Sequence, residues 1–336
     1  KKPLPGFTAD GEAINVIVID SEGLGALDED SNHDVRIFSL AILLSSYFLY
    51  NSVGSIDENA LQNLSLVINL TKHIQIWSGA TTDDIDPEEY SEYFPNFMWV
   101  VWDFSLQLVD KDGEVITSKE YLEKALDTQK GFSETVEHKN WIRRLLKSFF
   151  KERDCCTMIW PFTDEEALQN LQSKDLNDLW PEFVEQVLQL RRKVLNWIKA
   201  KTLNGKWISG SMFADLTINY VNGINKGIVP NIENAWSYVC KNECQKALQE
   251  SLDLFDEEFK NSFENRYPLY EDELWELFRD SKKIALEHFN KKAMGEISHE
   301  YLEDLEMKFD QKYSQYRAEN ENESWKSCQI FLQTYY

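Results

Sequence analysis

The sequence is short of basic residues and of cysteine, and it has no long hydrophobic run. It contains 35 lysines and arginines against 58 aspartates and glutamates, a formal net charge of -23, which disfavours binding to nucleic acid. Its five cysteines are odd in number and irregularly spaced, so we expect free thiols and a reducing, cytoplasmic location. The longest apolar stretch, residues 37–50, is interrupted by serines and is too short to cross a bilayer.

A glycine-rich phosphate loop of the form GxxxxGK[ST] is also missing ahead of the first acidic motif. That motif, Asp20-Ser21-Glu22-Gly23-Leu24-Gly25, directly follows the apolar run Asn15–Ile19. An acid followed by glycine at the end of a buried strand suits magnesium and phosphate. The motif therefore predicts one half of a phosphate site, but the pattern is short, and many such aspartates merely end strands.

Apolar strand-like runs alternate with helical segments over the first half of the chain. We expect strands at residues 15–19, 47–51, 97–101 and 156–160, and helices at residues 37–44, 59–73 and 140–150. This alternation predicts a mostly parallel sheet with flanking helices. Asp20 follows the apolar run Asn15–Ile19, and Asp103 comes just after the apolar run Phe97–Val101. Both carboxylates are therefore expected at the carboxyl edge of the sheet, where ligands bind.

The character of the chain changes at about Leu203. Strand-like runs give way to long charged segments with apolar residues every three or four positions, which predict an elongated all-α region. We place the two domains at residues 1–200 and 201–336. Cys240 and Cys244 are one helical turn apart, but no further metal ligands flank them, so they are interpreted as ordinary thiols.

The residues around these motifs resemble the guanylate-binding proteins, which are dynamin-like large GTPases. The resemblance covers the chain up to about Ala247 and is carried by Asp20–Gly25, Ile37–Ser46, Phe48–Ser52, Phe94–Trp99, Asp103–Leu106, Lys201–Gly205 and Tyr220–Ala235. It implies an α/β GTPase domain, truncated at its N-terminal end and lacking the phosphate loop and switch I, followed by an all-α helical middle domain.

The resemblance also implies roles for individual residues. Asp20 would hold magnesium through a water, Glu22 would organise the water that attacks the γ-phosphate, and Ser21, Gly23 and Leu24 would lie beside the phosphates. Asp103 would accept two hydrogen bonds from the guanine edge, because a planar carboxylate can accept from the ring N–H and the exocyclic amine together. The family motif Thr-Leu-Arg-Asp reads Val100-Val101-Trp102-Asp103 here, so Trp102 replaces the arginine and could stack near the base or ribose.

By the same resemblance, the parent protein would bind GTP and GDP with Mg²⁺, hydrolyse GTP and form a GTP-dependent homodimer. Membrane association of the full-length protein is compatible with it. Without a phosphate loop, the chain as printed is expected to bind and cleave GTP weakly. Two alternatives stay open, a nucleotide-independent helical scaffold and an atlastin-like membrane-remodelling GTPase. Glu22, where atlastin-like members tend to carry glutamine, favours the guanylate-binding branch.

Overall fold

The computed structural model of the chain describes residues 2–8, 10–21, 31–64, 74, 91–164, 168, 173–263, 266 and 268–335. It contains two compact units. Unit 1 comprises Lys1–Phe213 and Thr217–Glu233, and unit 2 comprises Ala214–Leu216 and Asn234–Tyr336.

A parallel three-stranded sheet forms the centre of unit 1. Its strands are β3 (Tyr47–Val53), β4 (Asn96–Trp102) and β5 (Arg153–Thr157), in the order β3-β4-β5. All residues of Phe97–Val101 are buried, which explains the unbroken apolar run of this central strand. The expected strands at residues 47–51 and 97–101 are confirmed. The third was expected at residues 156–160 but begins earlier, at Arg153, because Lys193 pairs with Asp154 and lets this carboxylate lie inside the strand.

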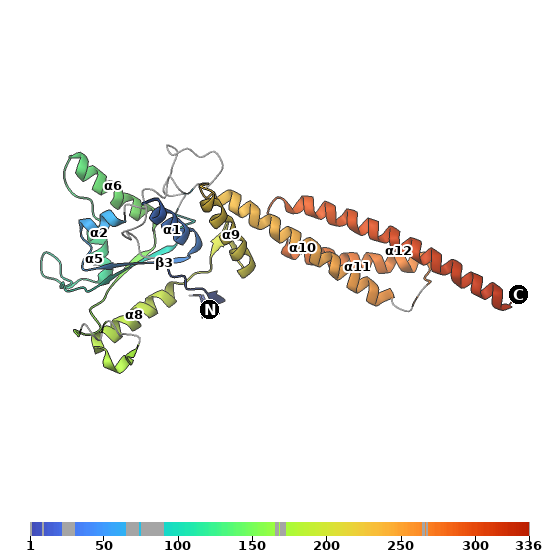
Figure 1. The fold of residues 1–336 in the computed structure, drawn as a ribbon, viewed down its shortest axis with the longest axis horizontal. Coiled ribbons are helices and arrows are strands. Elements are labelled where there is room, and N and C mark those ends of the chain that lie inside the picture. The colour runs from blue at the N-terminus through green and yellow to red at the C-terminus, as the bar shows by residue number, and fades with distance from the viewer. Residues whose placement is uncertain are drawn as a thin grey trace. The chain divides into compact units, whose positions relative to one another are not determined.

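Helices cover both faces of this sheet (Figure 1). On one side, Phe97 contacts Phe48 of β3 and Phe150, which follows α6 (Glu134–Phe149), while Phe48 meets Phe38 of α1 (Ser31–Leu44). On the other side, Met98 and Val100 pack with Phe183 of α8 (Pro181–Trp197). The shorter helices of this unit are α2 (Glu58–Asn63), α5 (Ser118–Ala125) and the 3-10 turn η2 (Leu176–Asp178). The α/β class predicted from the sequence is therefore confirmed.

The N-terminal segment differs from the prediction. β1 (Leu4–Phe7) and β2 (Ala13–Val16) form an antiparallel pair, separate from the three-stranded sheet. The prediction of a buried parallel strand at residues 15–19 is wrong, because β2 ends at Val16 and Ile17, Val18 and Ile19 are 50%, 78% and 56% exposed. An apolar run is buried only where neighbouring strands or helices cover it, and β1 alone does not cover this one.

A short hairpin follows α8 at the end of the α/β region. β6 (Thr202–Leu203) and β7 (Lys206–Trp207) pair in antiparallel fashion around Asn204 and Gly205, whose φ angles are 48° and 70°. Positive φ at both central positions is the geometry of the tight hairpin turn that Asn-Gly favours. Lys201 directly precedes β6, and its carbonyl accepts from the amide of Ile208 at 2.8 Å.

The remainder of the chain is helical, as expected. The helices are α9 (Gly210–Asn225), α10 (Ile232–Phe263), α11 (Glu271–Lys292) and α12 (Ser298–Tyr335), and Pro268 lies between α10 and α11. In unit 2 the last three helices share an aromatic core in which Phe255 contacts Phe259, Phe278 and Phe309. Helical spacing of apolar residues produced this core.

None of the five cysteines, all of which lie in the described part of the chain, forms a disulfide bond. Cys155 and Cys156 are buried in β5, Cys240 and Cys244 are buried in α10, and Cys328 on α12 is exposed. Burial raises the pKa of Cys155 to about 12. Within the described ranges, no group of three or more histidine, cysteine or acidic side chains is placed to hold a metal ion.

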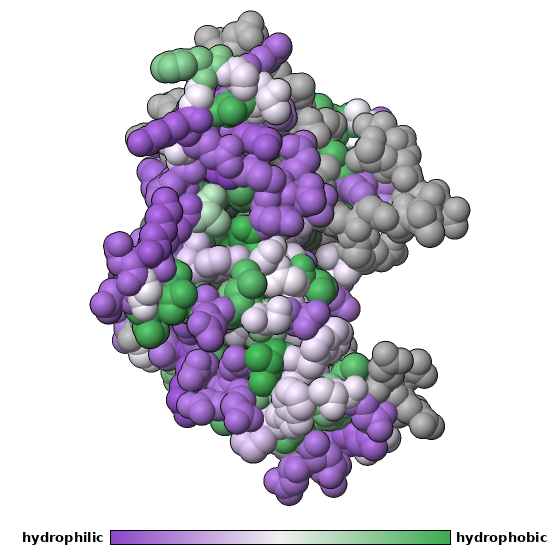
Figure 2. Space-filling model, turned by 90° about the vertical axis from the view of Figure 1, so that its left-hand side faces the viewer, coloured by the Kyte–Doolittle hydropathy of each residue, from purple (hydrophilic) through white to green (hydrophobic). Residues whose placement is uncertain are grey.

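One face of unit 1 is largely polar (Figure 2). Figure 2 shows this face, where hydrophilic residues cover most of the area and hydrophobic residues form separate patches between them. No helix in the described part of the chain combines the length and the apolar character that a bilayer span requires.

Candidate functional site at the carboxyl edge of the sheet

The carboxyl ends of β3 and β4 lie side by side and are joined beyond the last strand pair. Val53 is opposite Trp102 in the register of the two strands. The amide of Gly54 then donates to the carbonyl of Trp102 at 2.7 Å, and Gly54 has a φ of 90°, which favours glycine. The chain after β3 is therefore held against the residue that precedes Asp103.

Asp103 occupies a restricted position at this edge. Its φ is 53°, one of two positive values among the described non-glycine residues. The next amide, that of Phe104, donates to Met158 at 3.0 Å, and the amide of Met158 donates to Val101 at 2.8 Å. Hydrogen bonds on both sides thus fix the left-handed backbone of Asp103. Aspartate tolerates this conformation better than most residues, and such positions are concentrated at functional sites.

The Asp103 carboxylate is available to a ligand. The residue is half-buried, and among the described residues its side chain has no hydrogen-bond or ion-pair partner. A planar acceptor of this kind, at the end of the central parallel strand, can receive two donors from one flat molecule. The structure therefore supplies an oriented acceptor where open α/β sheets bind their ligands.

Trp102 is fixed by neighbours on the α8 side of the sheet. Its indole Nε1 donates to Asn51 Oδ1 of β3 at 3.2 Å, and its ring lies 6.3 Å from that of Phe183, measured between centroids. The ring also packs against the cluster that contains Val100. A side chain held by a hydrogen bond and by packing has few other rotamers open to it.

Residues far apart in the sequence support the same edge. The hydroxyl of Tyr121 in α5 accepts from the amide of Ile56 at 2.9 Å, and its ring contacts Phe104 at 5.4 Å between centroids. Gln186 of α8 accepts from the amide of Ile159 through Oε1 at 2.9 Å. Burial raises the pKa of the Tyr121 phenol, which keeps it neutral. Sequence reasoning missed these residues and Asn51, because no local motif marks a partner contributed by a distant element.

An ion pair anchors the loop after β3. Glu58 at the start of α2 bonds to the buried guanidinium of Arg143 in α6, and Lys139 lies 3.4 Å from the same carboxylate. Partial burial opposes ionisation of Glu58, but hydrogen bonds and charge from Arg143 and Lys139 lower its pKa overall. This network connects the residues following Gly54 to the outer helix layer.

The first acidic motif is not joined to this edge by strand pairing. Asp20 and Ser21 are exposed beyond β2, which belongs to a separate sheet. Glu22, Gly23 and Leu24 lie outside the described residues. Of the predicted site residues, the structure therefore brings together Trp102 and Asp103, and it leaves the predicted roles of the Asp20 motif untested.

The described residues form a parallel sheet with helices on both faces, followed by a set of long helices. This arrangement defines an α/β protein with a helical extension. Residues 5–203 match the family described as "Guanylate-binding protein, N-terminal domain", and residues 204–336 match "Guanylate-binding protein, C-terminal domain". The chain belongs to the guanylate-binding protein family.

Individual relatives agree with this assignment. The chain is 31% identical to human Guanylate-binding protein 2 over 321 residues, covering 95% of this chain and 54% of the relative. It is 32% identical to human Guanylate-binding protein 6 over 327 residues, covering 94% and 50%. It is 32% identical to Guanylate-binding protein 1 of Chlorocebus aethiops over 321 residues, covering 95% and 54%. The chain therefore spans about half the length of these relatives.

Proposed function

We propose that this chain is part of a GTPase that recognises guanine through Asp103. The observation that carries the proposal is the oriented carboxylate at the end of β4, which has a fixed backbone and no partner among the described residues. Guanine presents the ring N1–H and the exocyclic amine side by side on one edge. A carboxylate that accepts from both distinguishes guanine from adenine, which has a ring acceptor at N1.

Trp102 has a supporting role in this proposal. Its hydrogen bond to Asn51 and its contact with Phe183 hold the residue before Asp103 in place. The family's arginine at this position would add a charged donor, whereas tryptophan adds a rigid apolar surface. We therefore assign base recognition to the carboxylate and ascribe to Trp102 the orientation of the strand end, with its ring near the base or ribose.

The phosphate half of the site is assigned to Asp20, Ser21, Glu22, Gly23 and Leu24. Magnesium bound with a nucleotide needs only one or two protein carboxylates, since phosphate oxygens and waters supply the other ligands. Asp20 fits this donor set, because it is an exposed carboxylate with no partner among the described residues. When bound, the ion neutralises charge on the phosphates. Glu22 would orient the attacking water by accepting a hydrogen bond, and the Gly23 amide would donate to the γ-phosphate.

Two further properties belong to the proposal for the whole protein. We propose GTP-dependent association of two copies, supported only by membership of the family. We also propose a cytoplasmic location, supported by five cysteines that form no disulfide bond. Sedimentation of the protein with and without a non-hydrolysable GTP analogue tests the first, and only monomer in both samples would contradict it.

The decisive experiment exchanges the acceptor at Asp103. Asp103→Asn replaces one acceptor oxygen by an N–H₂ donor, which clashes with the guanine amine but matches the C2 carbonyl of xanthine. We expect GTP affinity to fall about 10- to 100-fold, the value of one charge-assisted hydrogen bond, and affinity for xanthosine triphosphate to rise. Fluorescent analogues of GTP, ATP and xanthosine triphosphate, titrated against the full-length protein with and without the substitution, measure both changes.

Asp127→Asn is the matched control, because Asp127 is an exposed carboxylate paired with Lys147 on the outside of the same unit. It removes the same charge and should leave all three affinities unchanged. Equal losses in the two variants, or a GTP loss at Asp103 without any gain for xanthosine triphosphate, would show that Asp103 does not contact the base.

A further inference from the structure

A cavity opens at the amino edge of the parallel sheet, opposite the end that carries Asp103. It has a volume of about 260 Å³, and Ser46, Pro95 and Glu152, each close to the start of a strand, are among its lining residues. All of its lining residues belong to unit 1. Because it is at the opposite end of the strands, this cavity is separate from the proposed guanine site.

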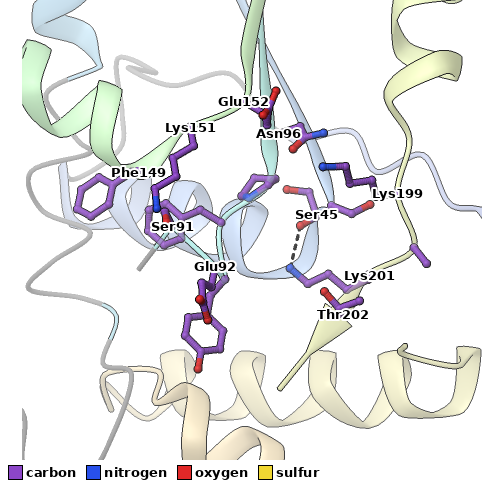
Figure 3. A pocket seen from close by; sticks show the side chains of 15 residues that line it. Ser45, Ser91, Glu92, Asn96, Phe149, Lys151, Glu152, Lys199, Lys201 and Thr202 are labelled. Atoms are coloured by element: carbon purple, nitrogen blue, oxygen red, sulfur yellow. Dashed lines mark hydrogen bonds between the residues drawn. The ribbon is translucent and has the colours of Figure 1, made fainter. Parts of the chain in front are cut away.

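Three lysines from two segments converge on the cavity. Figure 3 shows Lys151 on one side and Lys199 and Lys201 on the other, with the hydroxyl-bearing residues Ser45 and Thr202 near Lys201. Two carboxylates, Glu92 and Glu152, also line it. In the part of the chain that the structure describes, however, none of the three lysines is within ion-pair distance of a carboxylate. The cavity thus has an excess of positive charge in a protein whose net charge is -23.

Of the three lysines, Lys201 has the side chain whose position is most constrained, because a hydrogen bond holds it. Its Nζ donates to the carbonyl of Ser45 at 2.8 Å, at the C-terminal end of α1, where a cation is favoured by the helix dipole. An ammonium group has three N–H donors, and this carbonyl is its only partner among the described residues. Burial lowers the pKa of Lys201 to about 8.

We propose that this cavity binds a small phosphate dianion, free or as a monoester, through Lys151, Lys199 and Lys201. The anion supplies acceptors for the remaining donors of Lys201 and a counter-charge for the other two lysines. The volume is slightly below the range of about 300–1,000 Å³ that is typical of sites for drug-sized ligands, which favours a small ligand over a nucleotide. Hydroxyl groups at the rim, such as that of Thr202, add neutral donors.

Binding is tested by isothermal titration of the full chain with inorganic phosphate, with glycerol 3-phosphate and with acetate. We expect saturable binding of the two phosphates and weaker binding of acetate, which carries a single charge. Tighter binding of glycerol 3-phosphate than of inorganic phosphate assigns the site to a monoester, and the reverse order assigns it to the free ion. Failure of both phosphates to saturate would overturn the proposal.

Charge-matched variants locate the site. Lys199→Gln and Lys151→Gln each remove one ammonium and leave the Lys201 hydrogen bond to Ser45 intact, and each should weaken phosphate binding about tenfold. Lys147→Gln is the control, since Lys147 lies on α6 outside the cavity and pairs with Asp127. Equal effects of Lys147→Gln and Lys199→Gln would show that only the overall charge matters. Asp103→Asn should leave phosphate binding unchanged, which separates this site from the proposed nucleotide site.

Dependence on pH gives a second readout. Sulfate keeps its two charges from pH 7 to pH 9, so its affinity reports the charges of the protein. Lys201 is protonated below about pH 8 and loses its charge above it, so sulfate affinity should fall about tenfold over this interval. Glu92, Glu152, Tyr93, Lys151 and Lys199 face the same cavity. A Lys201→Gln variant should therefore bind sulfate weakly with a flatter profile, and an unchanged profile would contradict the role of Lys201.

Discussion

The ion pair between Lys193 of α8 and Asp154 of β5 should be a major source of stability in unit 1. Lys193 Nζ lies 3.0 Å and 2.9 Å from the two carboxylate oxygens, and it also donates to the Cys155 carbonyl at 2.8 Å. The Asp154 side chain is 10% exposed and that of Lys193 is 33% exposed. The carboxylate is therefore the buried partner, while the ammonium retains access to water.

In the Lys193→Met variant, the Cys155 amide, at 2.7 Å, is the hydrogen-bond partner that this carboxylate keeps among the described residues. Breaking a fully buried ion pair from one side costs about 3–5 kcal/mol. Because Lys193 is one-third exposed, solvent screens the pair, and we expect a smaller loss of about 2–3 kcal/mol in the free energy of unfolding. Asp154→Asn should cost less, about 1–2 kcal/mol, because the unpaired lysine can extend into solvent.

A double-mutant cycle measured by urea denaturation separates the interaction free energy of the pair from the effects of the two single substitutions. Tryptophan fluorescence is a suitable signal, since Trp99 is fully buried in the adjacent strand β4. We expect a coupling free energy of about 1–2 kcal/mol between Lys193 and Asp154. A coupling below about 0.5 kcal/mol would refute the reasoning, because the pair would then contribute no more than distant, independent residues do.

Three other predictions follow from the described contacts. The pKa of Glu58 is held below its ordinary value of 4.5, so its pairing with Arg143 stabilises the fold above that pH. This stabilisation is lost as the pH falls through the lowered pKa. The Arg143→Met variant should therefore lose less stability on acid titration, which circular dichroism can follow. Gly54→Ala should cost about 1–2 kcal/mol in urea denaturation, because φ is 90° while the added Cβ meets no atom within 4 Å, and a neutral result would show that the loop relaxes. Phe255→Ala should cost unit 2 about 3–5 kcal/mol, whereas Ile330→Ala, at a residue 65% exposed, should change stability by less than about 0.5 kcal/mol.

Much of the fold could be predicted because its elements follow local periodicity. The apolar runs at Tyr47 and Phe97 became β3 and β4, and three- to four-residue spacing of apolar side chains became the long helices. The run at residues 15–19 failed for a tertiary reason. Hydrophobic residues predict burial, but they do not supply the neighbouring strand that a parallel sheet needs, and Val18 is 78% exposed.

The candidate site was predictable only where a motif marked it. Asp103 was identified by its position after an apolar strand and by the family resemblance, and its contact with a nucleotide stays a prediction. Its supports, Asn51, Tyr121 and Gln186, come from three elements and have no shared sequence pattern. No local motif marks Lys201, because its partial burial and its bond to Ser45 depend on contacts between residues 156 positions apart.

The unequal burial of the five thiols has a practical consequence for spectroscopy. Four are enclosed in β5 and α10, and only Cys328 is open to solvent. A thiolate is the species that reacts with maleimides, so burial and the raised pKa of Cys155 protect the interior thiols. A single dye or spin label can therefore be attached to α12 of the native sequence without any substitution, and the label would report on its environment while the interior thiols stay unmodified.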